Sequence, residues 1–337
     1  MRDYILQIEQ GENLSQDEIT VVMELIMSGH APLGDIKSFL LALNKKGPTV
    51  EEITACALIM RKFVLPVKTH HEVILDVVGT GGDHKNTFNI STVTAIVVAA
   101  CGVAVAKHGN RRVSSRCGSA DVLEALGVKV DIEEKYLSQS LDSLGLAFLF
   151  AQRLHPAMKN VAPVRQELGV RTIFNVLGPL TNPARATHQI MGVYSRELVE
   201  PMCRVLKNLG LKRALVVHGN DGLDEITTTD KTFVSEFNGQ EIMSYDINPD
   251  ELGIALASID DLLGGDALEN AAIVLNILKG EPGPRRNIVV VNCAYALYTS
   301  GAVDNLLQGM RMAEHAIDSN RALQKLEELK EFTNRVR

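Results

Sequence analysis

A glycine-rich turn at residues 78–83, Val-Gly-Thr-Gly-Gly-Asp, constrains the fold of this chain more than any other feature. The apolar run 73–78 before it is typical of a buried strand, and the glycine- and proline-free run from Asn89 to Ala100 is typical of a buried helix. In such a turn main-chain N–H groups can converge on a phosphate, and the helix N-terminus adds free donors. The glycine spacing matches neither the lysine-bearing P-loop nor the dinucleotide fingerprint. The stretch therefore predicts an α/β fold with a phosphate site, with an ordinary tight turn as the alternative.

A second strand–loop–helix unit follows directly. Residues 103–106 predict a short strand, residues 107–111 (Lys-His-Gly-Asn-Arg) follow its end, and residues 122–126 begin a helix that Gly127 ends. The polar loop 114–121 lies between them. Loops that follow parallel strands gather at one edge of the sheet. A lysine, a histidine, three arginines and several hydroxyls should therefore lie beside the glycine turn, which suggests a ligand with more than one phosphate.

The rest of the chain predicts two domains, as its 337 residues also suggest. Residues 2–66 are typical of helices, with capping-box spacing at Ser15–Glu18 and Thr49–Glu52. We therefore expect a small all-helical domain over residues 1–70 and a larger α/β domain over residues 71–337. In the larger domain, predicted strands alternate with helices, which favours a mainly parallel central sheet flanked by helices on both faces. The strands are expected near 73–78, 103–107, 147–151, 188–193 and 213–218, and the helices near 89–101, 119–127, 133–144 and 196–209.

The C-terminal third predicts a hairpin followed by helices. Residues 232–237 and 241–246 flank Asn238-Gly239, a turn signal between two strands. Helices are expected near 249–264, 267–280, 288–300 and 303–333, although residues 287–292 could also begin as a strand.

Composition excludes several classes of protein. The net charge of −7 and the absence of tryptophan argue against a nucleic-acid binder. No run approaches about 18 apolar residues, so no membrane span is expected. The N-terminus carries no apolar signal core, and the five cysteines form no Cys-x-x-Cys pair, which favours a reduced, cytoplasmic protein. The histidines show no metal-ligand spacing, so zinc is not expected.

Asp224-Glu225 is the candidate metal-binding pair. Adjacent carboxylates in a glycine-flanked loop suit Mg²⁺, which keeps waters and bridges to phosphates. The alternative is a solvated acidic turn. The apolar run 213–217 before the loop places the pair at the same edge of the sheet as the glycine turn.

In their order along the chain, these motifs resemble those of the anthranilate phosphoribosyltransferases. The resemblance rests on residues 79–83, 89–92, 107–111, 118–121, 155–158, 163–165, 169–175, 177–180, 182–183 and 222–225. It implies transfer of a phosphoribosyl group from phosphoribosyl pyrophosphate to the amine of anthranilate, in tryptophan biosynthesis. It also implies two Mg²⁺ ions per subunit and a homodimer formed through the helical domain. Part of the proline-rich segment 155–185 should cross back to pack on that domain.

The resemblance also implies the residues of each subsite. For the phosphoribosyl pyrophosphate donor these are Gly79, Thr80, Gly81, Gly82, Asp83, Thr87, Asn89, Ser91, Thr92, Lys107 and Ser119. For anthranilate they are Gly79, His108, Asn110, Ala151, His155, Met158 and Arg165, whose guanidinium can pair with a carboxylate in a bidentate way. For metal they are Ser91, Asp224 and Glu225. No general acid or base is assigned.

Two rival functions remain open at this point. A pyrimidine nucleoside phosphorylase would use inorganic phosphate instead of a pyrophosphate donor, and the Lys-His-Gly-Asn-Arg and Asp-Glu motifs argue against it. A non-catalytic nucleic-acid-binding relative should show a basic groove and a degraded glycine turn, and neither is present. Arg112 and Met158 depart from the family's common pattern, where a small residue and an aromatic residue are usual, and leave the acceptor less certain.

Overall fold

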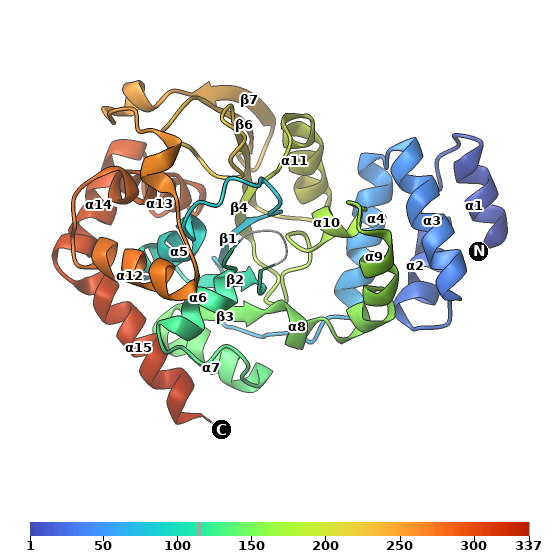
Figure 1. The fold of residues 1–337 in the computed structure, drawn as a ribbon, viewed down its shortest axis with the longest axis horizontal. Coiled ribbons are helices and arrows are strands. Elements are labelled where there is room, and N and C mark those ends of the chain that lie inside the picture. The colour runs from blue at the N-terminus through green and yellow to red at the C-terminus, as the bar shows by residue number, and fades with distance from the viewer. Residues whose placement is uncertain (113–115, 337) are drawn as a thin grey trace.

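The computed structural model describes residues 1–112 and 116–336. A mainly parallel sheet with helices on both faces forms the larger part, and a helical bundle that contains the N-terminus lies beside it (Figure 1). Ser114 and Ser115 of the predicted polar loop lie outside the described residues. In the part of the chain that is described, no helix combines the length and the apolar character needed to cross a membrane.

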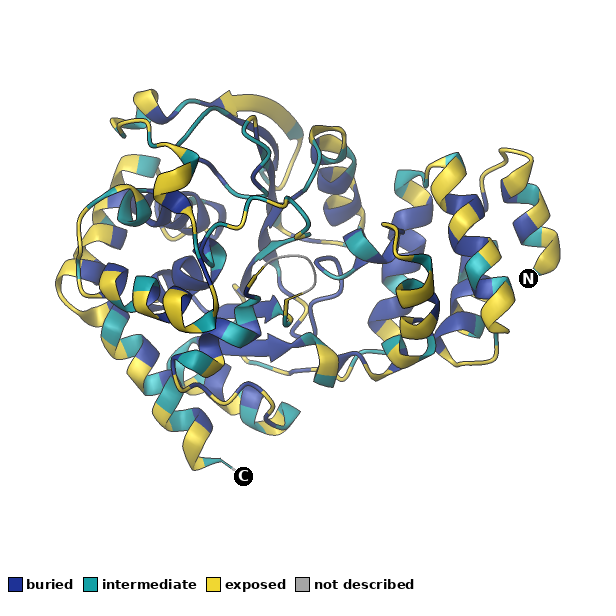
Figure 2. Ribbon diagram, viewed as in Figure 1, coloured by how far each residue is buried: buried dark blue, intermediate teal, exposed yellow. Residues whose placement is uncertain are grey.

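Four helices form the N-terminal bundle. They are α1 (Arg2–Glu9), α2 (Gln16–Met27), α3 (Leu33–Lys46) and α4 (Val50–Lys62). Both predicted capping boxes are present, because Ser15 and Thr49 accept from the N–H of Glu18 and Glu52, whose side chains accept from the cap N–H groups in return. Helices α1, α2 and α3 each have one buried face and one exposed face (Figure 2), whereas α4 is buried on almost all sides. The bundle therefore encloses an apolar core, which it shares with the crossing segment described below and with α11 (Val199–Asn208).

Seven strands form one sheet in the order β3-β2-β1-β4-β5-β6-β7. The first five strands in this order form four parallel pairs, and β6 and β7 continue the sheet as an antiparallel hairpin. The predicted mainly parallel sheet and the predicted hairpin are thus confirmed. The strands are β1 (Leu75–Gly79), β2 (Val105–Gly109), β3 (Leu146–Phe150), β4 (His188–Gly192), β5 (Arg213–Gly219), β6 (Thr232–Phe237) and β7 (Ile242–Ile247).

Side chains alternate between two cores along each strand, as the pleat requires. Val77, Phe148 and Val217 face a core built with α5, α6 and α12 to α15, whereas Leu149 and Val216 face the opposite side. That opposite side is covered by α7, α11 and the bundle. The helices not yet located are α5 (Ile90–Ala100), α6 (Ser119–Ala125), α7 (Glu134–Leu144), α11 (Val199–Asn208), α12 (Ala267–Leu278), α13 (Pro284–Thr299), α14 (Leu306–Asp318) and α15 (Arg321–Arg335).

The chain crosses from the sheet to the bundle and back between β3 and β4. This crossing segment contains α8 (Ala151–Leu154), a 3₁₀ turn η1 (Pro156–Asn160), α9 (Ala162–Leu168) and α10 (Phe174–Leu177). Its Val161, Val164 and Leu177 are buried in the same core as α2, α3 and α4. It therefore packs on the bundle, where α9 lies beside α3 and α10 lies beside α4.

Two predictions in the C-terminal third are wrong, and one alternative is excluded. The helix expected near 249–264 is two short 3₁₀ turns, η3 (Pro249–Leu252) and η4 (Ile259–Leu262), because Gly253 at φ 70° ends the first. The single helix expected over 303–333 is broken at Asn320, whose φ of 60° separates α14 from α15. Residues 287–292 lie within α13, which Pro284 starts at the first helical position, so the strand alternative is excluded. A further 3₁₀ turn, η2 (Arg196–Leu198), precedes α11.

Candidate active site at the carboxyl edge of the sheet

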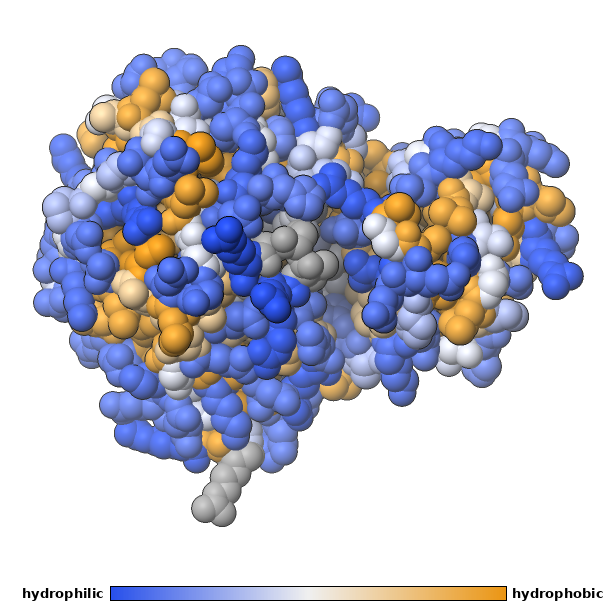
Figure 3. Space-filling view, viewed as in Figure 1, coloured by the Kyte–Doolittle hydropathy of each residue, from blue (hydrophilic) through white to orange (hydrophobic). Residues whose placement is uncertain are grey.

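The candidate site lies where the strand order of the parallel sheet reverses. From β1 the chain proceeds to β2 and β3 on one side, then returns to β4 on the other side of β1. Ligands of open α/β sheets bind at the carboxyl ends of strands beside such a reversal. Gly79 ends β1, Gly192 ends β4, and the two are paired in the sheet. A hollow between the sheet and the bundle adjoins this edge (Figure 3), and hydrophilic residues form much of its visible rim.

Asp224 lies directly over this pair of glycines. A Cβ atom at Gly79 would overlap Asp224 Oδ2, and a Cβ atom at Gly192 would overlap the Asp224 main-chain oxygen. The Gly81 N–H donates to Asp224 Oδ2 at 2.7 Å. Two strand-terminal glycines therefore allow the acidic loop after β5 to pack against the glycine turn after β1.

Glu225 connects the same loop to the start of α5. The Ser91 N–H donates to Glu225 Oε1 at 3.2 Å. The buried Lys107 ammonium, in the middle of β2, donates to Val77 O at 2.7 Å and to Ser91 Oγ at 3.2 Å. The predicted metal residues and Lys107 are thus brought together from three segments that are distant in the sequence.

Charge in this cluster is incompletely compensated. Desolvation raises the pKa of Asp224, and repulsion from Asp83 raises it further. Desolvation and repulsion from Asp224 likewise raise the pKa of Glu225. Burial lowers the pKa of Lys107, although the neighbouring carboxylates oppose that shift. Ser91, Asp224 and Glu225 offer one hydroxyl and two carboxylates, so all of their potential ligand atoms are oxygen. Mg²⁺ prefers oxygen ligands, and its charge would offset the excess negative charge here, so these residues fit Mg²⁺.

The glycine turn is held by side chains on both of its sides. Thr80 donates its N–H to Gly192 O and accepts the Tyr194 N–H at its hydroxyl. The Arg171 guanidinium lies 4.0 Å from the centre of the Tyr194 ring and donates to Gly82 O. Gly81 lies between the residues held by these contacts and is itself exposed, so the glycine turn is open to the hollow. Thr87 lies further along the loop and forms an isolated β-bridge with Leu263.

The polar side chains at the start of α5 and α6 do not act as ordinary caps. Among the described residues Asn89 caps no helix N–H; its amide donates to Cys117 O and its oxygen accepts from Asn270. Thr92 is 1% exposed, and its buried hydroxyl finds no partner in the described part of the chain. Ser119 Oγ donates to Asn110 O across the loop after β2. Asn89 therefore precedes α5 without capping it through its side chain.

The arginines after β2 do not all face a ligand. Arg111 forms ion pairs with Glu124 and Asp121 and lies over the Phe150 ring, so its charge is already compensated. Arg112 and Arg116 are exposed at the loop that contains the undescribed residues. Lys107 is therefore the cation of this unit that reaches the carboxylate cluster.

Two buried histidines contact each other on the side of the site nearest the crossing segment. His108 Nε2 and His155 Nε2 are 3.0 Å apart, so one must be protonated and the other must accept. The main chain of Gly178 hydrogen-bonds to the His108 ring, which favours His155 Nε2–H as the donor. Burial lowers both pKa values, that of His155 to about 4. Both rings are therefore neutral, and His155 Nδ1 is a buried acceptor with no partner among the described residues.

Arg165 lies on α9 of the crossing segment. Its guanidinium carbon lies 5.8 Å from the centre of the Phe174 ring, and it is half-buried, which lowers its pKa. Over residues 1–112 and 116–336, no carboxylate lies within ion-pair distance of it. Arg165 therefore forms no surface ion pair with any of the described residues. Met158 and Ala151 are half-buried along the same crossing segment, and Asn110 is exposed after β2.

The sequence analysis did not identify two aspartates, Asp76 and Asp221, whose hydrogen bonds hold the strands and loops of this site in place. Asp76 is fully buried in β1, accepts the His108 N–H at 3.0 Å, and accepts from Asn182 of the crossing segment at 2.8 Å. Burial raises the pKa of Asp76 to about 6. Asp221 accepts from the hydroxyls of Thr227 and Thr229 and so shapes the acidic loop. A charged residue inside the apolar run 73–78 was the available signal for Asp76.

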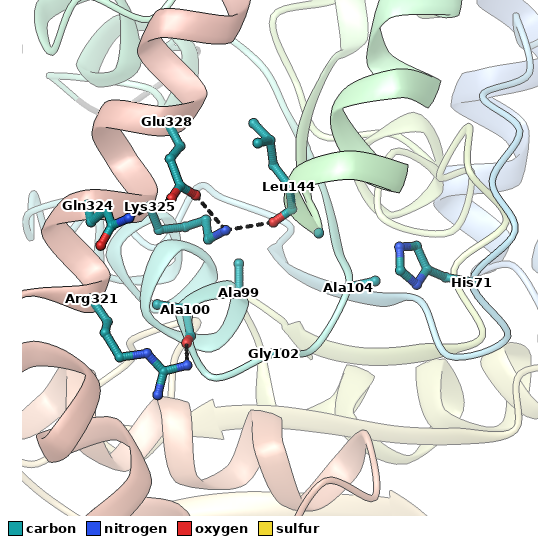
Figure 4. Close-up of a pocket in the computed structure, with 11 residues that line it drawn as sticks. His71, Ala99, Ala100, Gly102, Ala104, Leu144, Arg321, Gln324, Lys325 and Glu328 are labelled. Carbon is teal, nitrogen blue, oxygen red and sulfur yellow. Dashed lines mark hydrogen bonds and ion pairs between the residues drawn. The ribbon is translucent and has the colours of Figure 1, made fainter.

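A cavity of about 290 Å³ lies at the opposite, amino edge of the sheet (Figure 4). Arg321 and Lys325 of α15 project into it, but they donate to Ala100 O and Leu144 O, the C-terminal carbonyls of α5 and α7. Cationic side chains are favourable at helix C-termini. This cavity is therefore a helix-capping region and is separate from the carboxylate cluster.

Comparisons with known proteins agree with this geometry. A model described as the a/b domain of a glycosyl transferase family matches residues 71–323, and one for that family's helical bundle domain matches residues 2–64. An anthranilate phosphoribosyltransferase of Acetivibrio thermocellus is 51% identical over 99% of this chain and 97% of its own length. The crystal structure of the Thermus thermophilus anthranilate phosphoribosyltransferase is 42% identical, covers 98% of this chain and 99% of its own, and superposes with a TM-score of 0.93. The Saccharomyces cerevisiae enzyme in complex with phosphoribosyl pyrophosphate and Mg is 28% identical over 95% of this chain and 93% of its own, with a TM-score of 0.87.

Proposed function

The chain belongs to the glycosyl transferase family of the anthranilate phosphoribosyltransferases, and we propose how its own residues divide that family's reaction. It is an enzyme that transfers the 5-phosphoribosyl group from phosphoribosyl pyrophosphate to the amino group of anthranilate. The products are N-(5-phosphoribosyl)anthranilate and pyrophosphate, in tryptophan biosynthesis. The observation that carries the division is the packing of Asp224 and Glu225 over two strand-terminal glycines, beside Lys107 and Ser91.

We assign the donor to the carboxyl ends of β1 and β2. Main-chain N–H groups of the glycine turn and of the α5 N-terminus can face phosphate oxygens. The unpartnered Thr92 hydroxyl supports a phosphate partner there. The proposed donor residues are Gly79, Thr80, Gly81, Gly82, Asp83, Thr87, Asn89, Ser91, Thr92, Lys107 and Ser119.

Mg²⁺ serves this reaction, and we propose that Asp224, Glu225 and Ser91 hold it, with two ions per subunit. When bound, Mg²⁺ neutralises the charge of the departing pyrophosphate. The main-chain N–H groups of Gly81 and Ser91 orient the two carboxylates, and Lys107 offsets part of their charge.

We assign the acceptor to the side of the hollow formed by the crossing segment. The Arg165 guanidinium, which lacks a carboxylate partner among the described residues, suits the anthranilate carboxylate. The neutral imidazoles of His108 and His155 offer a weakly polar wall for an aromatic amine. The full proposed set is Gly79, His108, Asn110, Ala151, His155, Met158 and Arg165.

Positioning and electrostatics supply the catalysis in this proposal. An aromatic amine is nucleophilic while it is neutral, so no strong base is required before it attacks. Accordingly no residue is assigned as a general base. The chain's task is to hold the ribose carbon in line between pyrophosphate and amine and to exclude water.

We propose that the enzyme forms a homodimer through its helical bundle. The bundle exposes large apolar side chains, and Figure 3 shows apolar patches on the visible face of this part. These side chains are Leu6, Val21, Leu33 and Leu41, which are 42–55% exposed. Sedimentation that found only monomer at micromolar concentration would contradict this.

A cytoplasmic location of the protein stays a prediction.

One assay tests the proposed function as a whole. The protein is mixed with phosphoribosyl pyrophosphate, Mg²⁺ and anthranilate, and the loss of anthranilate fluorescence is followed. We expect the anthranilate fluorescence to fall only when phosphoribosyl pyrophosphate, Mg²⁺ and the protein are all present with anthranilate. Turnover of a pyrimidine nucleoside with inorganic phosphate, and none of anthranilate, would favour the phosphorylase instead.

A further inference from the structure

Two histidines and an aspartate converge at the amino edge of the sheet, away from the active site. His70 and His71 belong to the linker between α4 and β1, and Asp142 lies in the last turn of α7. One potential ligand atom from each of the three lies within 4.8 Å of the other two. The aspartate is 72 residues from His70 in the sequence, so no spacing motif could reveal the cluster.

The distances suit a transition-metal ion after a small adjustment. Zn²⁺ binds imidazole nitrogen and carboxylate oxygen at about 2.0–2.2 Å, so neighbouring ligand atoms lie about 3.4 Å apart. His70 Nδ1 and Asp142 Oδ1 are already 3.1 Å apart, and the His70 and His71 ring centres are 4.5 Å apart. The His70 side chain is 69% exposed and is therefore free to rotate toward an ion.

The hydrogen bonds around these three side chains resemble those of metal sites. A ligating histidine usually donates its other N–H to a carbonyl or a carboxylate, which fixes the tautomer. His71 Nε2 lies 3.1 Å from Leu141 O, which requires Nε2 to carry the proton and leaves Nδ1 as an acceptor. Asp142 Oδ1 accepts from the Thr69 hydroxyl and the His70 N–H, and these bonds orient the carboxylate.

The surrounding charge does not oppose a cation strongly. His71 also lines the cavity of Figure 4, where it lies across from Lys325. Lys325 donates to Leu144 O and pairs with Glu328 at 2.8 Å, so its charge is offset locally.

We propose that His70, His71 and Asp142 bind one divalent transition-metal ion of the zinc class, with water completing the coordination. The mixed nitrogen and oxygen ligands distinguish this site from the all-oxygen set proposed for Mg²⁺. A bound ion would join the linker to α7. The linker is one of the connections between the bundle and the sheet, where Leu65 N–H donates to Leu154 O and Val67 N–H to Pro183 O. Metal binding would therefore restrict how the bundle moves relative to the sheet.

Calorimetric titration of the whole protein with Zn²⁺, in a large excess of Mg²⁺, tests the proposal. We expect one Zn²⁺ per chain with a dissociation constant in the micromolar range, and visible absorption of the Co²⁺ form typical of a low-symmetry site. Affinity should fall at least tenfold in His71→Ala and in Asp142→Asn. His70→Ala, at an exposed position that the fold does not depend on, should show the same loss.

Two matched controls separate this site from other metal-binding groups. His315→Ala removes a histidine of α14 outside the cluster and should leave Zn²⁺ binding unchanged. Asp224→Asn with Glu225→Gln should also leave it unchanged. Undiminished binding in the His70→Ala, His71→Ala double variant, loss of binding only in the Asp224 and Glu225 variant, or no binding by the wild type at 100 μM Zn²⁺ would each overturn the proposal.

Discussion

The two halves of the proposed site are built in different ways. The donor half is made of main-chain turns, paired glycines and carboxylates that are fastened to the ends of β1, β4 and β5. The acceptor half is made of single side chains on the crossing segment, which rests on the bundle. In the donor half most polar groups already have partners, whereas the acceptor half contains a guanidinium and an imidazole nitrogen that lack them among the described residues.

This difference indicates what each half must do. A pyrophosphate donor carries much charge, so its site must be rigid and its charged groups must be held before the ligand arrives. An aromatic acceptor with one carboxylate needs one directed cation and an apolar slot. We therefore expect donor-half changes to affect turnover strongly and acceptor-half changes to affect mainly one substrate.

The largest effect should follow from removing charge in the donor half. Asp224→Asn with Glu225→Gln keeps the oxygens that accept from Gly81 and Ser91 but removes the charge proposed to hold Mg²⁺. We expect kcat to fall about 10³-fold or more. Because the two carboxylates repel each other, the melting temperature should not fall.

The matched control is another Asp-Glu pair, in the 3₁₀ turn η3. Asp250→Asn with Glu251→Gln removes the same charges from exposed positions and should retain wild-type kinetics. Normal activity and normal Mg²⁺ dependence in the Asp224 and Glu225 variant would remove that pair from the site.

The sequence was most informative where local chemistry determines structure. Strands β1 to β7 lie within about two residues of their predicted ranges, because buried strands carry apolar runs bounded by glycine. The donor motifs are contiguous, so Gly79 to Asp83 could be recognised as one turn. The wrong helix at 249–264 shows the limit, because Gly253 and contacts outside the segment, such as Ala257 N–H to Thr228 O, override a helical pattern.

Other parts of the site depend on contacts between distant segments and could not be predicted. Gly192 is unremarkable in the sequence, and its role emerges only because β4 pairs with β1 beneath Asp224. The same is true of Asp76 with Asn182 and of the histidine pair, whose members are 47 residues apart. Tertiary pairing, not local pattern, decides these positions.

Gly192→Ala should have the next largest effect. The added Cβ would overlap the Asp224 main-chain oxygen and displace the acidic loop without changing any charge. We expect kcat/KM to fall about a hundredfold, as for misplacement of a catalytic group by about 1 Å. Gly34→Ala in α3, where a Cβ meets nothing within 4 Å, is the control and should remain active. Wild-type Mg²⁺ dependence in Gly192→Ala would show that the loop position is not critical.

Arg165→Ala should have a smaller effect that is confined to the acceptor half. Loss of a charge-assisted bidentate contact should raise the apparent KM for anthranilate about ten- to a hundredfold and leave that for phosphoribosyl pyrophosphate nearly unchanged. Arg165→Lys should recover only part, because an ammonium lacks the planar fork. Saturation curves for each substrate measure this, with Arg204→Ala, an exposed ion-paired arginine of α11, as the control. If only the phosphoribosyl pyrophosphate curve moves, Arg165 belongs to the donor half.

The smallest effect should come from the neutral histidine pair of the acceptor half. The pKa of His155 falls from 6.5 to about 4 on folding, so between these values the unfolded chain binds a proton that the folded chain does not. Stability therefore falls as the pH falls through this window. From pH 6.5 to pH 5.5 the loss attributable to one such histidine is about 1 kcal/mol.

His155→Gln isolates this contribution, because its amide can still donate to His108 Nε2 but does not titrate. Urea unfolding at pH 6.5 and pH 5.5 should show that this variant loses about 1 kcal/mol less than the wild type over that interval. Burial also lowers the pKa of the buried His188 to about 4, and this residue titrates in both proteins and cancels in the difference. Burial, the largest cause of the lowered pKa of His108, is likewise present in both proteins. His315→Gln in α14 should behave as the wild type. An equal pH dependence in His155→Gln and the wild type would mean that His155 is not held neutral by burial, and the distinction between a neutral acceptor half and a charged donor half would fail.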